Sequence, residues 1–464
     1  MKDSFLKKLL FFFVLSFLML ASFTYGIISV RRQHLPYKIY LSLYQQKRKI
    51  SSPEWKREGI WHRVKNNAVD QELTEEQREA IAKISALPYL KGYNTAPDVE
   101  NVTIYDKQAA YNGLNFVVSA DAPKSFLMDM TGNVLHEWHI DFKDVWPESY
   151  TIEVPEVYKT YWRRAYLQEK GEVLAIFMNY GLVKLDKESN LLWSYKGRVH
   201  HDLFVAENGN IYVLARELRK NDNLRLESLT FDGPILEDFI TILSPEGKKI
   251  RKFSLIDCFL NSDYAPHLEH IKVPVDILHA NTIRPIDGRI VDKYPMFKKG
   301  HILVSMRAIH TVAVIDPEQE KVTWALTGMW KYQHEPRLLE NGNLLLFDNR
   351  GNDGKTKAIE FNPLTQEVVW TYKGEPAEVF YSREAGNISR LPNGNTLITE
   401  SENGKAFEVT PEGKIVWEFF NPYRAGENNE LIAALYDVVR YDQNQFDWLS
   451  LDTKKSKGGQ PGSP

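Results

Sequence analysis

The chain of 464 residues has a single cysteine, Cys258, so it cannot form an intramolecular disulfide and must be stabilised by its packed core. It also lacks a strong net charge. The formal value of -3 argues against nucleic acid as the main partner, because duplex binding depends on neutralising many phosphates. What the chain does have is 43% hydrophobic and 26% charged residues, a composition typical of folded globular proteins. Its 23 Tyr, 23 Phe and 11 Trp favour β-strands, since aromatic rings fit a half-buried pleated surface.

The longest uncharged run lies near the N-terminus, from Leu9 to Val30, with Lys7 and Lys8 before it. As a helix, these residues would span about 33 Å at roughly 1.5 Å per residue, enough to cross a bilayer core. A cleaved signal peptide is the alternative, but its apolar region is usually shorter, and the run lacks a good small-x-small cleavage site. We therefore expect residues 1–32 to form an N-terminal signal anchor of a single-pass membrane protein.

Basic residues are also frequent after this run, with ten Lys or Arg and only two Glu in residues 31–66. This segment is either a solvated stalk or one that binds lipid headgroups. The positive-inside rule alone would place the body of the protein in the cytoplasm, whereas a short leading tail ahead of an exported domain predicts the opposite side. Within the linker at residues 33–104, Thr74 and Gln77 form a capping box that predicts a helix to about Leu87.

From about residue 105 to 422, short apolar runs alternate with Gly, Pro, Asn and Asp, as in strands and turns. One unit recurs six times: a strand, a polar turn and a second strand that carries an aromatic residue. The six aromatic residues are Trp138, Trp193, Phe253, Trp324, Trp370 and Trp417. A glycine turn followed by an apolar run precedes five of these units, and a weaker form after Asn112 precedes the first. Two hairpins per repeat predict an all-β fold, a six-bladed β-propeller, rather than a large β-sandwich.

The remainder of the chain, residues 423–464, lies after the repeats. Its first part, residues 423–446, predicts a helical segment, and the low-complexity end from Thr453 predicts a disordered tail. The propeller is thus expected to have short helical segments on both sides.

Basic side chains occupy matching positions in neighbouring repeats. The glycine of the next turn follows eight residues after Arg163, His201 and His334, and nine residues after His279. If the strand before each glycine turn is the innermost of its blade, these side chains gather at one mouth of the central channel.

This set of side chains suits an anionic ligand better than a metal ion. Three imidazoles could bind zinc, but no carboxylate-bearing metal motif accompanies them, and Arg163 and Arg307 would repel a cation. Imidazole and guanidinium groups together favour the chemistry of sulfate or phosphate esters, with a neutral imidazole as nucleophile.

Five segments of the chain resemble the arylsulfate sulfotransferase (arylsulfotransferase) family of secreted or periplasmic propeller enzymes. They are HHDLFVAENGN at 200–210, HANT at 279–282, SMRAIHTVAVID at 305–316, QHEPRLLENGNLLLFDN at 333–349 and GNISRLPNGNTLITES at 386–401. The resemblance covers residues 74 to 441. It implies that a histidine accepts a sulfuryl group from an aryl sulfate donor and passes it to a phenolic acceptor. It also implies no cofactor, no metal and no nucleotide donor, which agrees with the lack of a glycine-rich phosphate loop.

Carried over residue by residue, His334 matches the nucleophile of the family's QH motif. The residues that match groups binding and activating the sulfuryl group are His201, His279 and Arg307. The further substrate-binding candidates are His200, Arg163, Asn281 and Asn349. The family also implies a propeller on the periplasmic or extracellular side of the membrane. A homodimer stays an open alternative.

The chain departs from well-studied relatives, which carry an N-terminal β-domain and a disulfide. Two other functions therefore stay open at this point. The first is a membrane-tethered scaffold without catalysis, like some quinoprotein-type propellers. The second is a hydrolase or lyase that uses the same cationic mouth.

Overall fold

The computed structural model describes residues 60–63, 99–149, 156–219, 235–272, 275–292, 294–375, 380–426 and 431–449, with Ser22, Tyr25 and Asn429. The chain divides into two compact units. One consists of residues 1–54 and 218–235, nearly all outside the described ranges, and the other contains residues 55–217 and 236–464. The predicted anchor, the capping-box helix and the C-terminal tail also lie outside the described ranges, as does most of the stalk. Among the described residues, no helix is both long and apolar enough to span a membrane.

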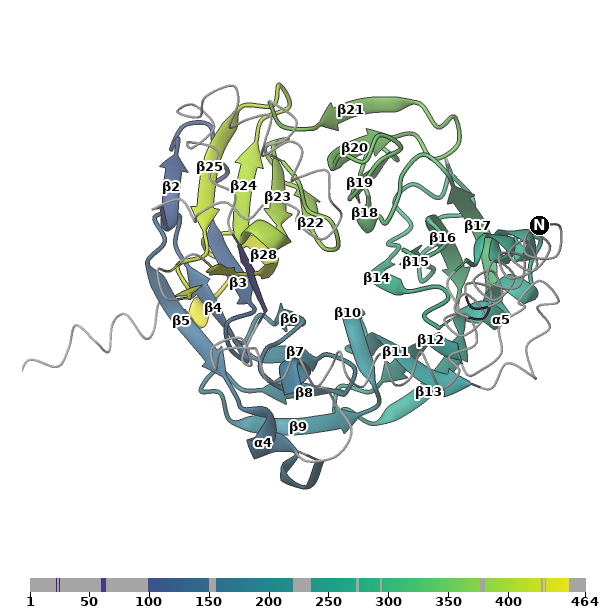
Figure 1. Ribbon diagram of the computed structural model, residues 1–464, viewed down its shortest axis with the longest axis horizontal. Helices are drawn as coiled ribbons and strands as arrows, with labels where there is room; N and C mark the ends of the chain where they lie inside the picture. Colours follow the sequence, from purple (N-terminus) through teal and green to yellow (C-terminus); the bar gives the residue numbers. More distant parts are fainter. Residues whose placement is uncertain are drawn as a thin grey trace, which may run out of the picture. The chain divides into compact units, whose positions relative to one another are not determined.

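Six antiparallel sheets form the blades of a β-propeller around a central axis (Figure 1). From the axis outwards, the first three blades consist of β28 (Leu435–Tyr441), β3 (Leu114–Ser119), β4 (Lys124–Met128) and β5 (Val134–His139); β6 (Arg164–Leu167), β7 (Val173–Phe177), β8 (Gly181–Leu185) and β9 (Leu191–Lys196); and β10 (Val199–Val205), β11 (Ile211–Arg219), β12 (Ile235–Leu243) and β13 (Lys249–Ser254).

The other three blades consist of β14 (Ala280–Pro285), β15 (Ile302–Met306), β16 (Thr311–Asp316) and β17 (Lys321–Thr327); β18 (His334–Leu338), β19 (Leu344–Asp348), β20 (Lys357–Phe361) and β21 (Val368–Tyr372); and β22 (Asn387–Arg390), β23 (Thr396–Glu400), β24 (Lys405–Val409) and β25 (Ile415–Phe420), with β2 (Asn101–Tyr105) as a fifth strand. The predicted six-bladed propeller is confirmed.

Short elements connect and flank the blades. They are a small sheet of β1 (Trp61–Arg63), β27 (Leu431–Ala433) and β26 (Arg424–Ala425), the α-helices α4 (Phe142–Val145) and α5 (Leu255–Leu260), and the 3-10 helices η3 (Pro147–Ser149), η4 (Glu156–Lys159), η6 (Ala265–His270) and η8 (Ser401–Asn403).

The aromatic residue that recurs in the repeats joins neighbouring blades. Four of the tryptophans lie on the fourth strand of a blade and donate their indole N–H to a backbone carbonyl in a turn of the next blade. These bonds are Trp138 to Gly171 (2.9 Å), Trp193 to Pro245 (3.1 Å), Trp370 to Pro411 (2.8 Å) and Trp417 to Met130 (3.0 Å). A tryptophan therefore recurs in this position because its ring fills the space between blades while its N–H satisfies a turn carbonyl.

The helix predicted at residues 423–446 is wrong. This segment forms β26, β27 and β28 instead, and β28 pairs antiparallel with β3 from Leu435↔Ser119 to Tyr441↔Leu114. The start of the repeats supplies only three strands of the first blade, β3, β4 and β5. Without a further strand, the backbone N–H and C=O groups on the inner edge of β3 would have no partners. Strand pairing therefore overrides the helical propensity of the segment, and a C-terminal strand closes the ring. This also explains the weaker glycine motif after Asn112, because the strand expected before it comes from the other end of the chain.

Charged side chains from the innermost strands meet across the axis. We call this set the axial network: Arg164 of β6, Asp202 of β10, Arg284 of β14, Glu335 and Arg337 of β18, Asn387 of β22 and Asp437 of β28. The central member is Arg164, whose guanidinium lies 2.8 Å from Asp202, 2.6 Å from Glu335 and 2.6 Å from Asp437. Every innermost strand thus contributes a polar group, so the axial network ties all six blades together.

Replacing Arg164 with leucine should lower the free energy of unfolding by about 3–5 kcal/mol, because it leaves three buried carboxylates without their shared counter-ion. Urea denaturation of both proteins measures the difference. Arg251→Leu is the control. It breaks a pair with Glu320 (2.9 Å) that is partly exposed to solvent, and such surface pairs contribute at most about 1 kcal/mol. Equal effects of the two substitutions would contradict a central role for Arg164.

Candidate active site

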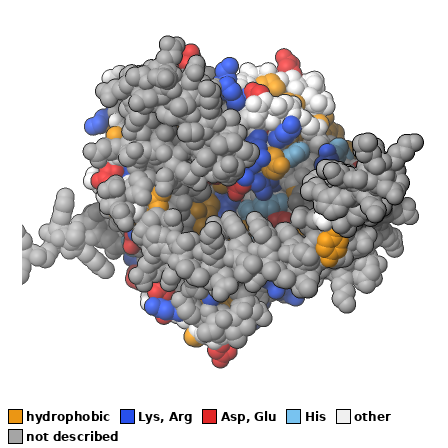
Figure 2. Space-filling view, in the orientation of Figure 1, with side chains coloured by type: hydrophobic (Ala, Val, Ile, Leu, Met, Phe, Trp, Pro, Cys, Tyr) orange, Lys and Arg blue, Asp and Glu red, His pale blue; other side chains and the backbone are white. Residues whose placement is uncertain are grey.

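The sequence-predicted basic residues lie at the start of the innermost strands, as expected from their spacing. Arg163 immediately precedes β6, His200 and His201 lie in β10, His279 immediately precedes β14, and His334 begins β18. We call this end of the channel the histidine mouth. In the view of Figure 2, histidine and Lys or Arg side chains gather in the hollow at the centre of the ring.

Two of these histidines adopt a backbone conformation that is uncommon for residues other than glycine. His201 and His279 both have φ of 50°, and Glu335, next to His334, has φ of 51°. All three lie where the pairing of the innermost strand with its neighbour shifts register or next to such a point. Non-glycine residues in the left-handed region concentrate at functional sites, where the surrounding structure holds them in place.

The environment of His334 fixes which of its nitrogens carries the proton. Its Nδ1 lies 2.7 Å from Oδ1 of Asn349 and 3.0 Å from the carbonyl oxygen of Tyr332. Asn349 cannot be turned round, because its Nδ2 donates to the carbonyls of Ser382 (2.8 Å) and Ala385 (2.9 Å). Both neighbours of Nδ1 are therefore acceptors, so Nδ1 carries the hydrogen. Nε2 keeps its lone pair, and it is buried without a hydrogen-bond partner among the described residues.

His334 also stays uncharged over a wide pH range. Burial and the nearby charge of Arg307 lower the pKa of His334 to about 3, against the opposing effect of the hydrogen bond with Asn349. A neutral imidazole with a free lone pair on Nε2 is a competent nucleophile at neutral pH.

The other two predicted histidines meet between the third and fourth blades. The rings of His201 and His279 lie edge to face with centroids 4.8 Å apart. Nδ1 of His279 lies 2.6 Å from Oδ2 of Asp276, which also receives Arg216 at 3.3 Å. Burial opposes ionisation of Asp276, but the hydrogen bond and charge of His279 and the charge of Arg216 lower its pKa. The carboxylate thus fixes the ring of His279 and leaves Nε2 of that ring turned away from it.

His200 is fully buried behind His201. Its Nδ1 lies 2.8 Å from Nδ1 of His201, and its Nε2 lies 3.1 Å from Oδ1 of Asp238. His200 has no exposed surface, and its Nε2 is buried without a hydrogen-bond partner among the described residues, so a direct contact of His200 with substrate stays a prediction.

Three arginines of the histidine mouth have no counter-ion among the described residues. Arg163, Arg307 and Arg350 form no ion pair there, and each lies over a tyrosine ring instead: Arg163 over Tyr436 at 4.3 Å, and Arg307 and Arg350 over Tyr332 at 4.9 and 4.3 Å. Burial lowers the pKa of Arg307, and the like charge of Arg350 adds to this effect while Glu384 opposes it. Guanidinium groups that form no ion pair are suited to bind an anion.

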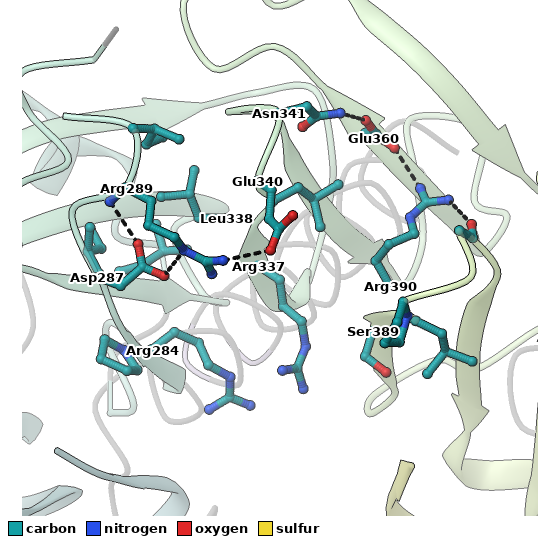
Figure 3. Close-up of a pocket in the computed structure, with 18 residues that line it drawn as sticks. Arg284, Asp287, Arg289, Arg337, Leu338, Glu340, Asn341, Glu360, Ser389 and Arg390 are labelled. Carbon is teal, nitrogen blue, oxygen red and sulfur yellow. Dashed lines mark hydrogen bonds and ion pairs between the residues drawn. The ribbon is translucent and has the colours of Figure 1, made fainter. Parts of the chain in front are cut away.

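Two cavities open at the two ends of the channel. The one at the histidine mouth has a volume of about 450 Å³ and is lined by Asp276, His279, Arg307 and Tyr332, among others. The one at the opposite mouth is larger, about 900 Å³, and contains four arginines (Figure 3). In contrast to those of the histidine mouth, all four have carboxylate partners: Arg284 and Arg337 contact Glu335, Arg289 contacts Asp287, and Arg390 contacts Glu360. Of these two cavities, the one at the histidine mouth therefore has cationic groups free for an anion.

Asn281 and Asn349 serve the site without reaching the cavity. Nδ2 of Asn281 donates to the carbonyl of Gln333 at 2.8 Å, next to His334, so Asn281 positions the start of β18. Asn349 orients His334 as described above. Both contacts are with protein groups, and a role of these two residues in substrate binding stays a prediction. In the described ranges, no group of three or more His, Cys, Asp or Glu side chains is arranged to hold a metal ion.

Four further residues at the site were not predicted from the sequence: Arg216, Asp238, Asp276 and Arg350. Asp276 precedes His279 by three residues, and Arg350 follows Asn349 directly, so proximity in sequence could have indicated both. Arg216 and Asp238 carry no such signal, because they reach the histidines from neighbouring strands of the third blade.

Fold and site together define a six-bladed propeller protein with histidines and unpaired arginines at one mouth of its channel, among the described residues. The chain belongs to the arylsulfotransferase (ASST) family, whose sequence model matches residues 169–422, more than half of its length. The matched region includes all three histidines at the mouth, with Arg307 and Asn349. No curated protein matches the chain at a significant level.

Solved structures resemble the chain only distantly. A protein of unknown function from Bacteroides caccae has 14% identity and a TM-score of 0.46, over 71% of this chain and 98% of that chain. Virginiamycin B lyase from Staphylococcus aureus has 11% identity and a TM-score of 0.34, over 60% of this chain and 83% of that chain. A streptogramin B lyase has 12% identity and a TM-score of 0.39, over 74% and 96% respectively. Likeness at this level supports no conclusion about function.

Arg307→Gln should raise the pKa of His334, because it removes the charge that, after burial, lowers this pKa most. In the wild-type protein, His334 should stay neutral with its proton on Nδ1 until the pH falls to about 3. Nitrogen-15 NMR of histidine-labelled protein, with the signal assigned by His334→Gln, measures both. Arg390→Gln, in the opposite cavity, should leave the pKa of His334 unchanged. An imidazolium at His334 already at pH 6 in the wild type would contradict this electrostatic account.

Proposed function

We propose that the protein is a nucleotide-independent sulfotransferase that moves a sulfuryl group from an aryl sulfate donor to a phenolic acceptor through a sulfohistidine at His334. Membership of the arylsulfotransferase family supports the reaction class. The observation that carries the mechanism is the neutral His334, whose proton is fixed on Nδ1 and whose Nε2 is buried without a partner among the described residues.

Transfer takes place in two displacements. In the first, the lone pair of Nε2 attacks sulfur, the bond between sulfur and the aryl oxygen breaks, and the phenolate leaves with the electron pair. In the second, the acceptor phenol gives its proton to solvent, its oxygen attacks sulfur, and the bond between sulfur and Nε2 breaks, which restores His334. The phenolate released in the first step takes up a proton from solvent in exchange. The covalent intermediate thus splits one difficult step into two easier ones, as in other nucleophilic catalysis.

The free cations of the histidine mouth bind the sulfuryl oxygens. Arg307 and His279 line the cavity, and Arg163 acts on His334 through its charge. Arg307 forms no ion pair among the described residues, and Asp276 holds the ring of His279 in place, so neither group needs to rearrange when the transition state forms. Preorganised cations of this kind are a large source of catalysis in group transfer.

Incubation of the full-length protein with 4-nitrophenyl sulfate and phenol should release 4-nitrophenol and form phenyl sulfate. His334→Gln should abolish the release, and Arg307→Gln should lower its rate about 10²–10³-fold, as for loss of one oxyanion-binding group. Without acceptor, mass spectrometry should detect one sulfuryl group on the peptide that contains His334. The control is His301→Gln, a buried histidine 3.6 Å from Asp316 and outside the site, which should keep the activity.

The same assay separates the two other functions. Release of 4-nitrophenol in a stoichiometric burst without acceptor agrees with sulfotransfer, whereas continued turnover in water indicates a hydrolase. A protein that forms neither product nor sulfohistidine would contradict an arylsulfotransferase and favour a scaffold.

We also propose that residues 9–30 anchor the protein in a membrane, with the propeller on the periplasmic or extracellular side. The support is the length and lack of charge of this run. The full chain should therefore stay in the membrane fraction after alkaline carbonate washing, and removal of residues 1–32 should release it. In sealed vesicles of known orientation, protease digestion reports the side of the propeller. Recovery of the full chain in the soluble fraction would contradict the anchor.

A further inference from the structure

We propose that Tyr332 is a positioning residue that holds the nucleophile and a sulfuryl-binding arginine in a fixed geometry, with its backbone on His334 and its ring on Arg307. This inference rests on the proposed function and deepens it, because both groups must act on the same sulfuryl group. Tyr332 lies two residues before His334, in the connection between β17 and β18, and it lines the cavity at the histidine mouth.

The backbone of Tyr332 is bonded to the site on both sides. Its carbonyl oxygen accepts a hydrogen bond from Nδ1 of His334 (3.0 Å), and its N–H donates to Nδ1 of His310 (3.2 Å). His310 belongs to the turn that begins at Arg307, where its own N–H donates to the carbonyl of Arg307 (3.3 Å). Tyr332 has φ of 59°, an uncommon backbone conformation for a bulky residue, and these bonds hold it there. The backbone thus joins the nucleophile to the turn that carries Arg307.

The ring of Tyr332 supports two arginines. The guanidinium carbon of Arg307 lies 4.9 Å from the ring centroid, and that of Arg350 lies 4.3 Å from it. No hydrogen bond or ion pair holds either guanidinium among the described residues, and the Nε of each is buried without a partner there. A cation is attracted to the face of an aromatic ring, and a guanidinium can stack on it. The ring is therefore the group that orients both arginines.

An aromatic ring orients a cation without neutralising it. At the opposite mouth, carboxylates orient the arginines and also cancel their charge, as Glu360 does for Arg390 at 2.6 Å. The ring of Tyr332 carries no net charge, so Arg307 keeps its own charge for the sulfuryl oxygens. Because the same residue bonds to His334, a shift of the ring would move the cation relative to Nε2. Group transfer is sensitive to such shifts, since a misplacement of about 1 Å can cost about 10²-fold in rate.

The test compares Tyr332→Leu with Tyr332→Phe in the full-length protein. Both variants keep the backbone carbonyl that bonds to His334, but only phenylalanine keeps a ring under the arginines. With 4-nitrophenyl sulfate and phenol, kcat of Tyr332→Leu should fall about 10–30-fold, the size expected for the loss of one desolvated cation–π contact. Tyr332→Phe should restore the rate to within about twofold of the wild type, because its ring can carry the same cations.

A double variant shows whether the ring acts through Arg307. Tyr332→Leu added to Arg307→Gln should lower kcat by less than about threefold, because the arginine that the ring positions is already absent. A merely structural role of Tyr332 would instead predict the full loss in either background, since the effects of independent sites add.

The pKa of His334 gives a readout that does not depend on turnover. After burial, the charge of Arg307 contributes most to the low pKa of His334, so this pKa reports how close the guanidinium lies. Tyr332→Leu should therefore raise the pKa of His334 in nitrogen-15 NMR, and Tyr332→Phe should not. In the Arg307→Gln background, Tyr332→Leu should produce no further rise, whereas better solvation of His334 alone would raise the pKa there as well.

Tyr423→Leu is the matched control, because it removes another ring that carries a cation, Lys124 at 3.7 Å, and that packs against Phe126 of the first blade. It should leave kcat and the pKa of His334 unchanged. A Tyr332→Phe variant as slow as Tyr332→Leu, or a full loss on adding Tyr332→Leu to Arg307→Gln, would overturn the positioning role while leaving sulfotransfer at His334 intact. Failure of the wild type to consume any aryl sulfate would instead refute the proposed function, and the pKa of His334 would still report whether the ring positions Arg307.

Discussion

The contact of Arg164 with three carboxylates from three blades is the constraint on which the rest of the propeller depends. At the axis, the innermost strands bring their polar groups together away from solvent, and an unpaired charge there would be costly. The axial network satisfies this demand with groups from all six innermost strands, including the C-terminal β28. The strand that completes the ring, β28, therefore also supplies one of the carboxylates that neutralise Arg164. An alternative register of β28 would leave Arg164 without Asp437.

The axial network also positions the histidines, because two of its carboxylates directly follow them in sequence. Asp202 follows His201, and Glu335 follows His334. The carboxylate of each pair contacts Arg164, and the imidazole belongs to the histidine mouth. Consecutive side chains of a regular strand point to opposite faces, and the left-handed residue in each pair, His201 or Glu335, changes that geometry locally. The pairing with Arg164 offsets the cost of this backbone conformation, so the stability of the fold and the geometry of the site share the same residues.

The sequence was sufficient for the features that repeat and insufficient for those that do not. Six aromatic positions predict six blades, and equal spacing from the turn glycines predicts that His201 and His334 lie at the same end. The strand β28 occurs once and has no glycine turn after it, so only its pairing with β3 reveals it. The proton position on His334 depends on how Asn349 is held by two carbonyls more than thirty residues away in sequence. Asp238 meets His200 only because of the register between strands of one blade. Spacing along a single chain does not encode such contacts.

The two ends of the channel differ in whether their arginines are paired with carboxylates among the described residues. At the opposite mouth each arginine already has a carboxylate, so an anion would have to displace it. At the histidine mouth, Arg307 and Arg350 repel one another, and Arg307 also disfavours protonation of His334. The charge of Arg307 keeps the lone pair of His334 free, and an anion bound at this mouth would reduce the repulsion between the two arginines. A site that is electrostatically unfavourable when empty and neutralised by a sulfuryl group would attract the substrate and activate the nucleophile with the same charges.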